Sequence, residues 1–363
     1  MPLRLALAAL LAASALARAE EPAAPVESHL VPHTCAELGF RDFQGVLHSH
    51  SYLSHDSKIS QADIVAACEE AGVEFLCMTD HPSERSLSDG LEGWHGRTFF
   101  VVGAEVNHFL AVDIHTPIGN ADSQQTVDRV RAQGGLAFVA HSEEYTDWDV
   151  QGYHGMEIYN IHTDLKDEKK LERLLPKLPR ILEDPAWAMT LIFDEPKDLL
   201  ARWDQLTQQR RVVGIAGNDA HQNVMVMGLQ LDPYARSLGF VNTHVFALAM
   251  SKETLLDALS SGHVYVCFER FAPGKGFSFT AESGDAIAMM GDEVPYSGDL
   301  VLRAVFPREA RITLVRDGKP IHRVSGDEIN WSVTEPGVYR IAARVEARGR
   351  WWPWIYSNPI YVR

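Results

Sequence analysis

The chain has 363 residues and carries 49 acidic against 33 basic side chains, which gives a formal net charge of −16. This acidic surplus argues against a nucleic-acid polymer as partner, because proteins that bind the phosphate backbone need clustered Lys and Arg to release counterions. The length exceeds that of one ordinary core, so we expect one large domain and one small domain.

The first predicted feature is a secretory signal peptide over residues 1–19. Arg4 precedes an apolar run, and the small residues Ala17 and Ala19 mark a cleavage site directly before an acidic pair. The apolar run is shorter than the roughly 20 residues of a helix that spans a bilayer, so we expect no membrane span. The sequence therefore predicts export, to the periplasm or as a secreted protein, with residues 20–42 as an N-terminal tether.

Residues 43–272 alternate between apolar strands and amphipathic helices, which predicts an α/β fold with a largely parallel sheet, closed or open. The predicted strands are Phe43–His50, Val73–Asp80, Thr98–Val106, His108–Ile114, Leu136–His141, Met156–Asn160 and Arg211–Asp219. The predicted helices are Gln61–Gly72, Thr126–Gly135 and a charged helical region from Leu165 to Gln209.

The pattern changes near residues 271–276. From there, short alternating strands follow one another with turn residues between them, and Asp317-Gly318 is typical of a hairpin turn. We therefore predict a small all-β, immunoglobulin-like sandwich over residues 273–363. Its aromatic cluster, Trp351–Trp354, would either pack inside the protein or present a platform for carbohydrate or lipid.

Histidine and carboxylate side chains stand where the predicted strands end. In parallel α/β folds these ends meet on one face, and side chains two apart on a strand point to the same side. Burying so many polar groups without partners would cost several kcal/mol. Neutral imidazoles and carboxylates suit Zn, Mn or Fe, and several strands together can hold two or three divalent ions. The residues concerned are His48, His50, Asp80, His81, Glu105, His141, Asp219 and His221.

These residues carry a family resemblance. The run GVLHSHSYLSHDSKISQADIVAACEEAGVEFLCMTDH, with GAEV, AFVAHSEE and GNDAH after it, resembles the PHP superfamily, named for polymerase and histidinol phosphatase domains. The matching region runs from Phe43 to Arg270, and the end of the chain resembles the β domain of an exported branch that includes carbaryl hydrolase-like proteins. The resemblance implies a distorted (β/α)7 barrel with a trinuclear site at the carboxyl ends of its strands.

The resemblance also implies a division of the ligands among three ions. One ion would be held by the first two histidines of the motif, by Glu105 and by Asp219. Glu105 would bridge to a second ion, which His141 and one further histidine would hold. A third ion would be held by His81, by His221 and by a ligand from the SHDS segment. The first two histidines are His48 and His50.

Two ligand positions stay open. The family usually has Asp after the serine of HxHxxxSD, whereas this chain has His55 and then Asp56, and the spacing of the motif favours His55. The further histidine of the second ion is expected at His108, provided that a tight turn at Val106–Asn107 lets it face the same side as Glu105. In an unbroken strand His115 would have that orientation instead.

Other polar residues complete the predicted site. Glu157 and Asn160 would contact substrate or orient a ligand histidine from behind it. Asn218, which adjoins a ligand, would donate a hydrogen bond to a substrate oxygen. His55 or His221, where not committed to metal, would protonate the leaving group.

The predicted chemistry is hydrolysis. Divalent ions lower the pKa of a bridging water, so that a hydroxide can attack without a side-chain nucleophile. The leading hypothesis is a phosphoesterase that acts on a small or lipid-derived phosphomonoester or phosphodiester. The alternatives are a carbamate, ester or amide hydrolase, or a non-catalytic metal-loaded module that binds glycans. Arg or Lys near the metals would favour phosphate, and Lys58 and Arg85 are the nearest candidates.

Overall fold

The computed structural model describes most of the chain, and all of the described residues belong to one compact unit. The predicted signal peptide lies outside the described residues, as do the tether up to residue 33 and most of the predicted helical region before residue 193. The division at residue 272 stays a prediction. The described residues are 34–161, 163, 179, 184, 187, 190, 193–223, 225–226, 229–230 and 232–363.

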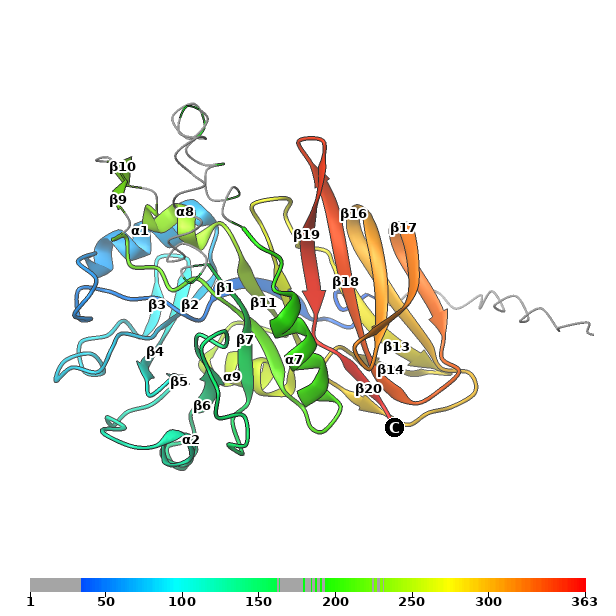
Figure 1. The fold of residues 1–363 in the computed structure, drawn as a ribbon, viewed down its shortest axis with the longest axis horizontal. Coiled ribbons are helices and arrows are strands. Elements are labelled where there is room, and N and C mark those ends of the chain that lie inside the picture. Colours follow the sequence, from blue (N-terminus) through cyan, green and yellow to red (C-terminus); the bar gives the residue numbers. More distant parts are fainter. Residues whose placement is uncertain are drawn as a thin grey trace, which may run out of the picture. The chain divides into compact units, whose positions relative to one another are not determined.

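Strands and helices alternate in the first part of the chain (Figure 1). The strands are β1 (Arg41–Val46), β2 (Phe75–Met78), β3 (Gly93–His95), β4 (Thr98–Val106), β5 (Phe109–Val112), β6 (Leu136–Val139), β7 (Gly155–Asn160), β8 (Val213–Gly217), β9 (Met225–Val226), β10 (Leu229–Gln230), β11 (Asn242–Ala247) and β12 (Val264–Cys267). The helices are α1 (Gln61–Ala71), α2 (Ser123–Ala132), α7 (Lys197–Thr207), α8 (Tyr234–Leu238) and α9 (Lys252–Ser261).

The predicted helix that closes at Gly72 is confirmed, and its ends follow from local chemistry. The Ser60 side chain accepts a hydrogen bond from the Asp63 backbone N–H and so caps the start of α1. Gly72 adopts a left-handed φ of 72°, which glycine reaches without steric cost, and this residue terminates the helix. The predicted strands around this helix are present as β1 and β2, and every residue of β2 is buried.

The sheet in this part is mixed rather than largely parallel. Strands β1, β2 and β4 pair in parallel, as do β6, β7 and β8, whereas β5 lies antiparallel to both β4 and β6. Within the described residues no ladder joins β8 to β1, and only an isolated bridge between Ser49 and Ala220 connects their ends. The chain is therefore mixed α/β with a sheet that is not closed, and the strand ends of β1 and β8 still meet.

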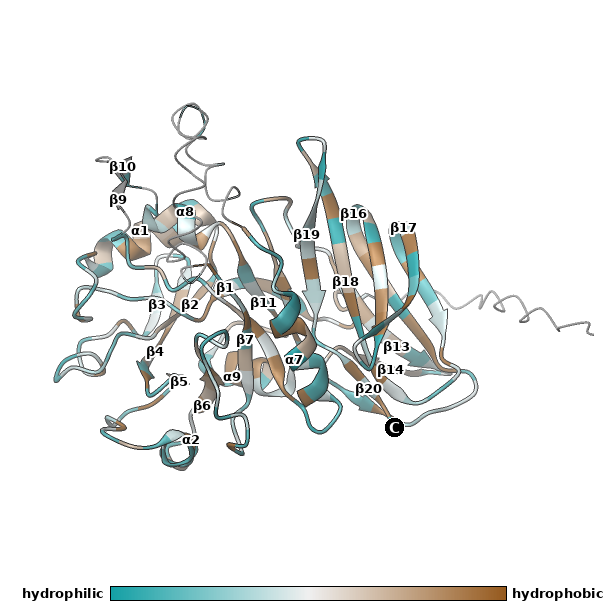
Figure 2. Ribbon diagram, viewed as in Figure 1, coloured by the Kyte–Doolittle hydropathy of each residue, from teal (hydrophilic) through white to brown (hydrophobic). Residues whose placement is uncertain are grey.

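The last part of the described chain contains strands only, as predicted. The hairpin at Asp317-Gly318 is confirmed, because both residues have positive φ and Arg316 pairs with Lys319 across the turn. Figure 2 shows apolar and polar residues alternating along the long strands of this part. The strands are β13 (Ser278–Ser283), β14 (Ala286–Met289), β15 (Glu293–Val294), β16 (Val301–Arg316), β17 (Lys319–Ser332), β18 (Gly337–Ala347), β19 (Arg350–Ser357) and β20 (Ile360–Val362).

The two parts of the chain are joined by main-chain pairing and by a buried ion pair. Strand β19 pairs antiparallel with β12, so the C-terminal strands belong to the same hydrogen-bonded network as the first part. Arg340 on β18 makes two hydrogen bonds, of 2.6 and 2.7 Å, to the carboxylate of Asp204 on α7. Trp352 and Trp354 are buried, so these two rings pack inside the protein and do not form a platform for a ligand. None of the described helices is both long enough and apolar enough to cross a bilayer.

Candidate metal centre

Two groups of imidazole and carboxylate side chains meet at the strand ends. In each group, one ligating atom from every member lies within 4.8 Å of those from the others. Together the groups contain seven of the nine predicted ligands, with Asp56 in addition. Group A is His48, Glu105, His141 and Asp219, and group B is His50, Asp56, His81 and His221.

Backbone hydrogen bonds between the ends of β1 and β8 bring the two sequence-distant pairs of ligands together. The Asp219 N–H donates to the His48 carbonyl at 3.0 Å, and the His50 N–H donates to the Ala220 carbonyl at 3.1 Å. Asp219 and His141 both have a φ of 47°, a left-handed conformation that is uncommon for residues other than glycine. Such backbone outliers cluster at functional sites, where the surrounding structure holds them in place.

In group A, ring nitrogens point directly at carboxylate oxygens. His48 Nε2 lies 3.1 Å from Glu105 Oε2 and 3.3 Å from Asp219 Oδ1. The Nε2 atom of His50 is 3.1 Å from that of His48, which connects the two groups. On the other side, His141 Nε2 lies 3.1 Å from Glu105 Oε1. The two oxygens of Glu105 therefore face different histidines.

The far side of several rings is held by protein acceptors, which decides where the lone pairs point. His48 Nδ1 donates to Glu157 Oε1 at 2.7 Å, and His221 Nδ1 donates to the Asp219 carbonyl at 2.8 Å. A neutral imidazole has only one N–H, so the Nε2 atoms of these rings present lone pairs to the carboxylates. Two hydrogen-bond acceptors that face each other repel unless a proton or a cation lies between them. These imidazole nitrogens and carboxylate oxygens are therefore arranged as a set of ligands that fits divalent metal ions.

The electrostatics of group A favour positive charge. Burial lowers the pKa of His48, but the carboxylates of Asp219, Glu157 and Glu105 outweigh burial and hold that pKa well above its usual value. Burial raises the pKa of Glu105, yet the surrounding histidines, His48 first among them, bring it well below its usual range. The same nitrogens thus suit either protons or metal cations.

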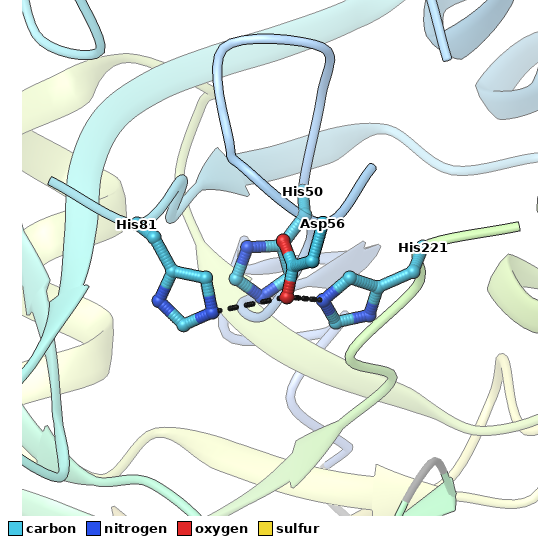
Figure 3. A group of neighbouring side chains, drawn as sticks. All are labelled: His50, Asp56, His81 and His221. Atoms are coloured by element: carbon cyan, nitrogen blue, oxygen red, sulfur yellow. Dashed lines mark hydrogen bonds and ion pairs between the residues drawn. The ribbon is translucent and has the colours of Figure 1, made fainter. Parts of the chain in front are cut away.

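Group B is arranged around Asp56. In Figure 3 the Asp56 carboxylate lies between the rings of His81 and His221, with His50 behind it, and its Oδ2 is 3.3 and 3.0 Å from their Nε2 atoms. His81 Nε2 is also 3.7 Å from Glu105 Oε2, which links this group to group A. The side chains of His81 and Asp56 are 28% and 30% exposed, so group B is open to solvent.

The structure places Asp56, and not the favoured His55, among the candidate ligands of group B. His55 is exposed, and its ring centroid is 4.8 Å from that of His81. The loop turns after Ser51, whose N–H and hydroxyl both bond the Asp80 carboxylate, and the Ser54 N–H closes the turn onto the Ser51 carbonyl. This turn directs Asp56, the second residue after Ser54, towards group B. The spacing of the motif therefore points to the adjacent residue, His55, instead.

Neither candidate for the further histidine of the second ion lies in a ligand group. The tight turn exists at Asn107–His108, one residue later than predicted, and both residues have positive φ. The turn leaves His108 exposed on the outside of the hairpin. His115 is also exposed, and its Nε2 atom lies 3.6 Å from Asp113 Oδ1.

The predicted substrate contacts are buried behind the ligands. Glu157, Asn160 and Asn218 are at most 1% exposed, and each bonds protein groups. The Asn218 amide donates to the carbonyls of Ser237 and Val241 at 2.8 Å, which ties the end of β8 to the segment around α8. The structure therefore shows these three residues in contact with protein groups, and their contact with substrate stays a prediction.

The two predicted proton donors differ in their surroundings. Both ring nitrogens of His221 face protein groups, Asp56 and the Asp219 carbonyl, so this ring is committed to the ligand groups. His55 is exposed beside them, and its role as a proton donor stays a prediction. Sequence reasoning missed Ser54, whose hydroxyl lies 3.2 Å from His50 Nδ1 and accepts from the His81 N–H. The sequence signal that could have identified Ser54 is its position in the SHDS segment.

A third group, His244, Cys267 and Glu269, has a different character. His244 Nδ1 and Nε2 each meet a carboxylate, of Asp42 at 2.7 Å and of Glu269 at 3.0 Å, so a protonated ring satisfies both. Burial raises the pKa of the Cys267 thiol well above its usual value, which makes it a poor metal ligand. This group is explained as a buried ion-pair network.

No protein-family model and no curated protein matches this chain.

Proposed function

We propose that this chain is a multinuclear metal-dependent hydrolase of the PHP type, and specifically a phosphoesterase. One observation carries the proposal: two adjoining sets of inward-facing imidazole nitrogens and carboxylate oxygens are linked through Glu105. Its Oε2 atom lies 3.1 Å from the Nε2 of His48, 3.3 Å from that of His50 and 3.7 Å from that of His81. A carboxylate with this position suits a bridge between two ions.

Some side chains of the site would hold the cations, and others border the space where substrate would bind. Bound divalent ions would supply an acidified water and the positive charge that the oxygens of the electrophile require. Glu105, Asp219 and the buried histidines fix the ligand geometry, since their side chains are at most 10% exposed. His81 and Asp56 form the solvent-facing edge, where a small or lipid-derived ester would approach.

His55 is the proposed proton donor for the leaving group. It is exposed next to His81, and the structure shows it in neither ligand group. Both predicted candidates for a phosphate contact, Lys58 and Arg85, are exposed, and Arg85 pairs with Asp89, whose carboxylate lies 2.6 Å from the Arg85 Nε atom. Offsetting the charge of a phosphate therefore falls mainly to the metal ions.

The test is an activity screen of the metal-reconstituted full chain with aryl phosphate monoesters, diesters and carbamates side by side. We expect hydrolysis of a phosphate ester that chelation abolishes and that Asp219→Asn lowers by at least about 100-fold. Glu282→Gln is the control, because Glu282 is a buried carboxylate of β13 in neither ligand group. If only carbamates are hydrolysed, the protein is a carbamate hydrolase and not a phosphoesterase. Metal binding without hydrolysis of any ester would favour the non-catalytic module that binds glycans.

The finer architecture belongs to the same proposal. We propose that β1 to β12 with their helices correspond to a distorted PHP barrel, and that β13 to β20 correspond to the immunoglobulin-like β domain. The support is the placement of ligands at strand ends and the change to strands alone after α9. We also propose export, which determination of the N-terminus of the mature protein in a periplasmic or secreted fraction would test.

A further inference from the structure

Glu157 on β7 is fully buried and makes three hydrogen bonds beneath group A. Its Oε1 atom accepts from His48 Nδ1 at 2.7 Å, and its Oε2 atom accepts from the His141 backbone N–H at 2.8 Å. The Asn160 side-chain amide donates to the same Oε2 at 2.9 Å. We propose that Glu157 is a positioning residue that holds two ligands of group A, from two different strands, in their metal-binding orientation. This inference rests on the proposed function.

The first effect of Glu157 is on the imidazole of His48. A carboxylate that accepts from Nδ1 fixes the proton there and leaves the Nε2 lone pair facing Glu105 and Asp219. It also fixes the rotation of the ring and makes the nitrogen a better donor to a cation. Without it, the proton could move to Nε2 and block the ligand position.

The second effect is on the backbone of His141. This residue holds a left-handed φ of 47°, which costs free energy for a side chain other than glycine. Its N–H points at Glu157 Oε2, so the bond stabilises the backbone conformation that turns the ring towards Glu105. One carboxylate thus orients a ligand after β1 and a ligand after β6.

Gly217 on β8 supplies an independent observation, because the chain leaves space there for the carboxylate. A Cβ atom at this position would lie 2.0 Å from Glu157 Oε1 and 2.9 Å from Asn160 Nδ2. The φ of Gly217 is not positive, so the backbone does not require glycine. The space that Glu157 occupies explains why residue 217 has no side chain. Gly217→Ala should therefore displace the Glu157 carboxylate, while every candidate ligand residue is kept.

The experiment measures stepwise zinc affinities of the full chain by competition with a chromogenic chelator. The variants are Glu157→Gln, which keeps the size but replaces one acceptor by a donor, and Gly217→Ala. Controls are Glu282→Gln and Gly298→Ala, since Glu282 is a buried carboxylate outside both groups and a Cβ at Gly298 would meet nothing within 4 Å. Asp56→Asn identifies the binding step that belongs to group B.

We expect both test variants to weaken the group A step roughly 10- to 100-fold while the group B step changes by less than about threefold. A general loss of structure would instead weaken both steps and lower the melting temperature of the metal-free protein. In zinc-loaded wild type, nitrogen-15 NMR should show the His48 proton on Nδ1.

Affinities of Glu157→Gln and Gly217→Ala within about twofold of wild type, or a His48 proton on Nε2, would overturn the role of Glu157. Wild-type protein that binds no zinc would instead defeat the proposed function, so the two failures are distinguishable. The NMR result depends on the wild type alone, so a His48 proton on Nε2 overturns the proposal even where a variant does not fold.

Discussion

Raising the pH should weaken the fold through one buried histidine, His244, which lies in neither ligand group. Its ring stands between the carboxylates of Asp42 and Glu269. Burial lowers the pKa of His244, but the two carboxylates outweigh burial and raise it to about 9. The Tyr265 hydroxyl donates to Asp42, and Lys275 adds positive charge near it. The folded ring is therefore protonated at neutral pH.

The size and direction of the effect follow from this pKa. An unfolded histidine titrates near 6.5, so the folded ring holds its proton more tightly. The stabilisation is fully present below about pH 6.5 and is lost as the pH rises through about 9. One pKa unit corresponds to about 1.4 kcal/mol, so the loss amounts to about 3 kcal/mol in the free energy of unfolding.

The assay is urea unfolding of wild type and His244→Gln between about pH 6 and about pH 10, with the same chelator in every sample. At the low end the variant should be about 3–5 kcal/mol less stable, because Asp42 and Glu269 remain buried without a cation. The difference between the two proteins should then shrink by about 3 kcal/mol as the pH rises. A difference that stays constant over this range would refute a protonated His244.

Three further predictions concern metal and the joint between the two parts. Elemental analysis should find two transition-metal ions per chain, one for each ligand group, and chelation should lower the melting temperature, because ions that bind only the folded state stabilise it. Fewer than one ion per chain after reconstitution would contradict the hypothesis of a multinuclear metal site. Glu105→Gln should weaken both ions together, whereas full occupancy and a wild-type rate would overturn the bridge. Asp204→Asn should cost about 3–5 kcal/mol in urea unfolding, because it leaves the Arg340 guanidinium buried without its carboxylate, and a loss below about 1 kcal/mol would contradict this.

The sequence could predict most ligands because strand geometry determines them. His48 and His50 follow the end of β1, and Asp219 and His221 follow the end of β8, so the two strands bring both pairs to the same edge. Glu105 is the next-to-last residue of β4 and reaches the same edge. Where a regular strand carries the ligand to the site, residue type and position along the strand are sufficient.

The remaining ligand choices depend on turns, which sequence spacing describes poorly. Asp56 replaces His55 because the hydrogen bonds of Ser51 bend the loop, and His108 points outward because two successive left-handed residues form its hairpin turn. The alternation of strands and helices also predicted a largely parallel sheet, closed or open. The antiparallel placement of β5 between β4 and β6 gives no such alternation, because a tight turn replaces the helix there.

The candidate metal centre is also part of what stabilises the fold. Glu105, Glu157 and Asp219 place three buried carboxylates around His48, and His141 and Asp219 hold left-handed backbone conformations that cost about 1–3 kcal/mol each. Such a cluster is stable only with positive charge at its centre, from protons or from metal ions. Loss of activity in a ligand variant can therefore arise from loss of fold, and only the stability measured with and without metal separates the two. A ligand that serves the chemistry alone would lower the rate without changing the stability of the metal-free protein.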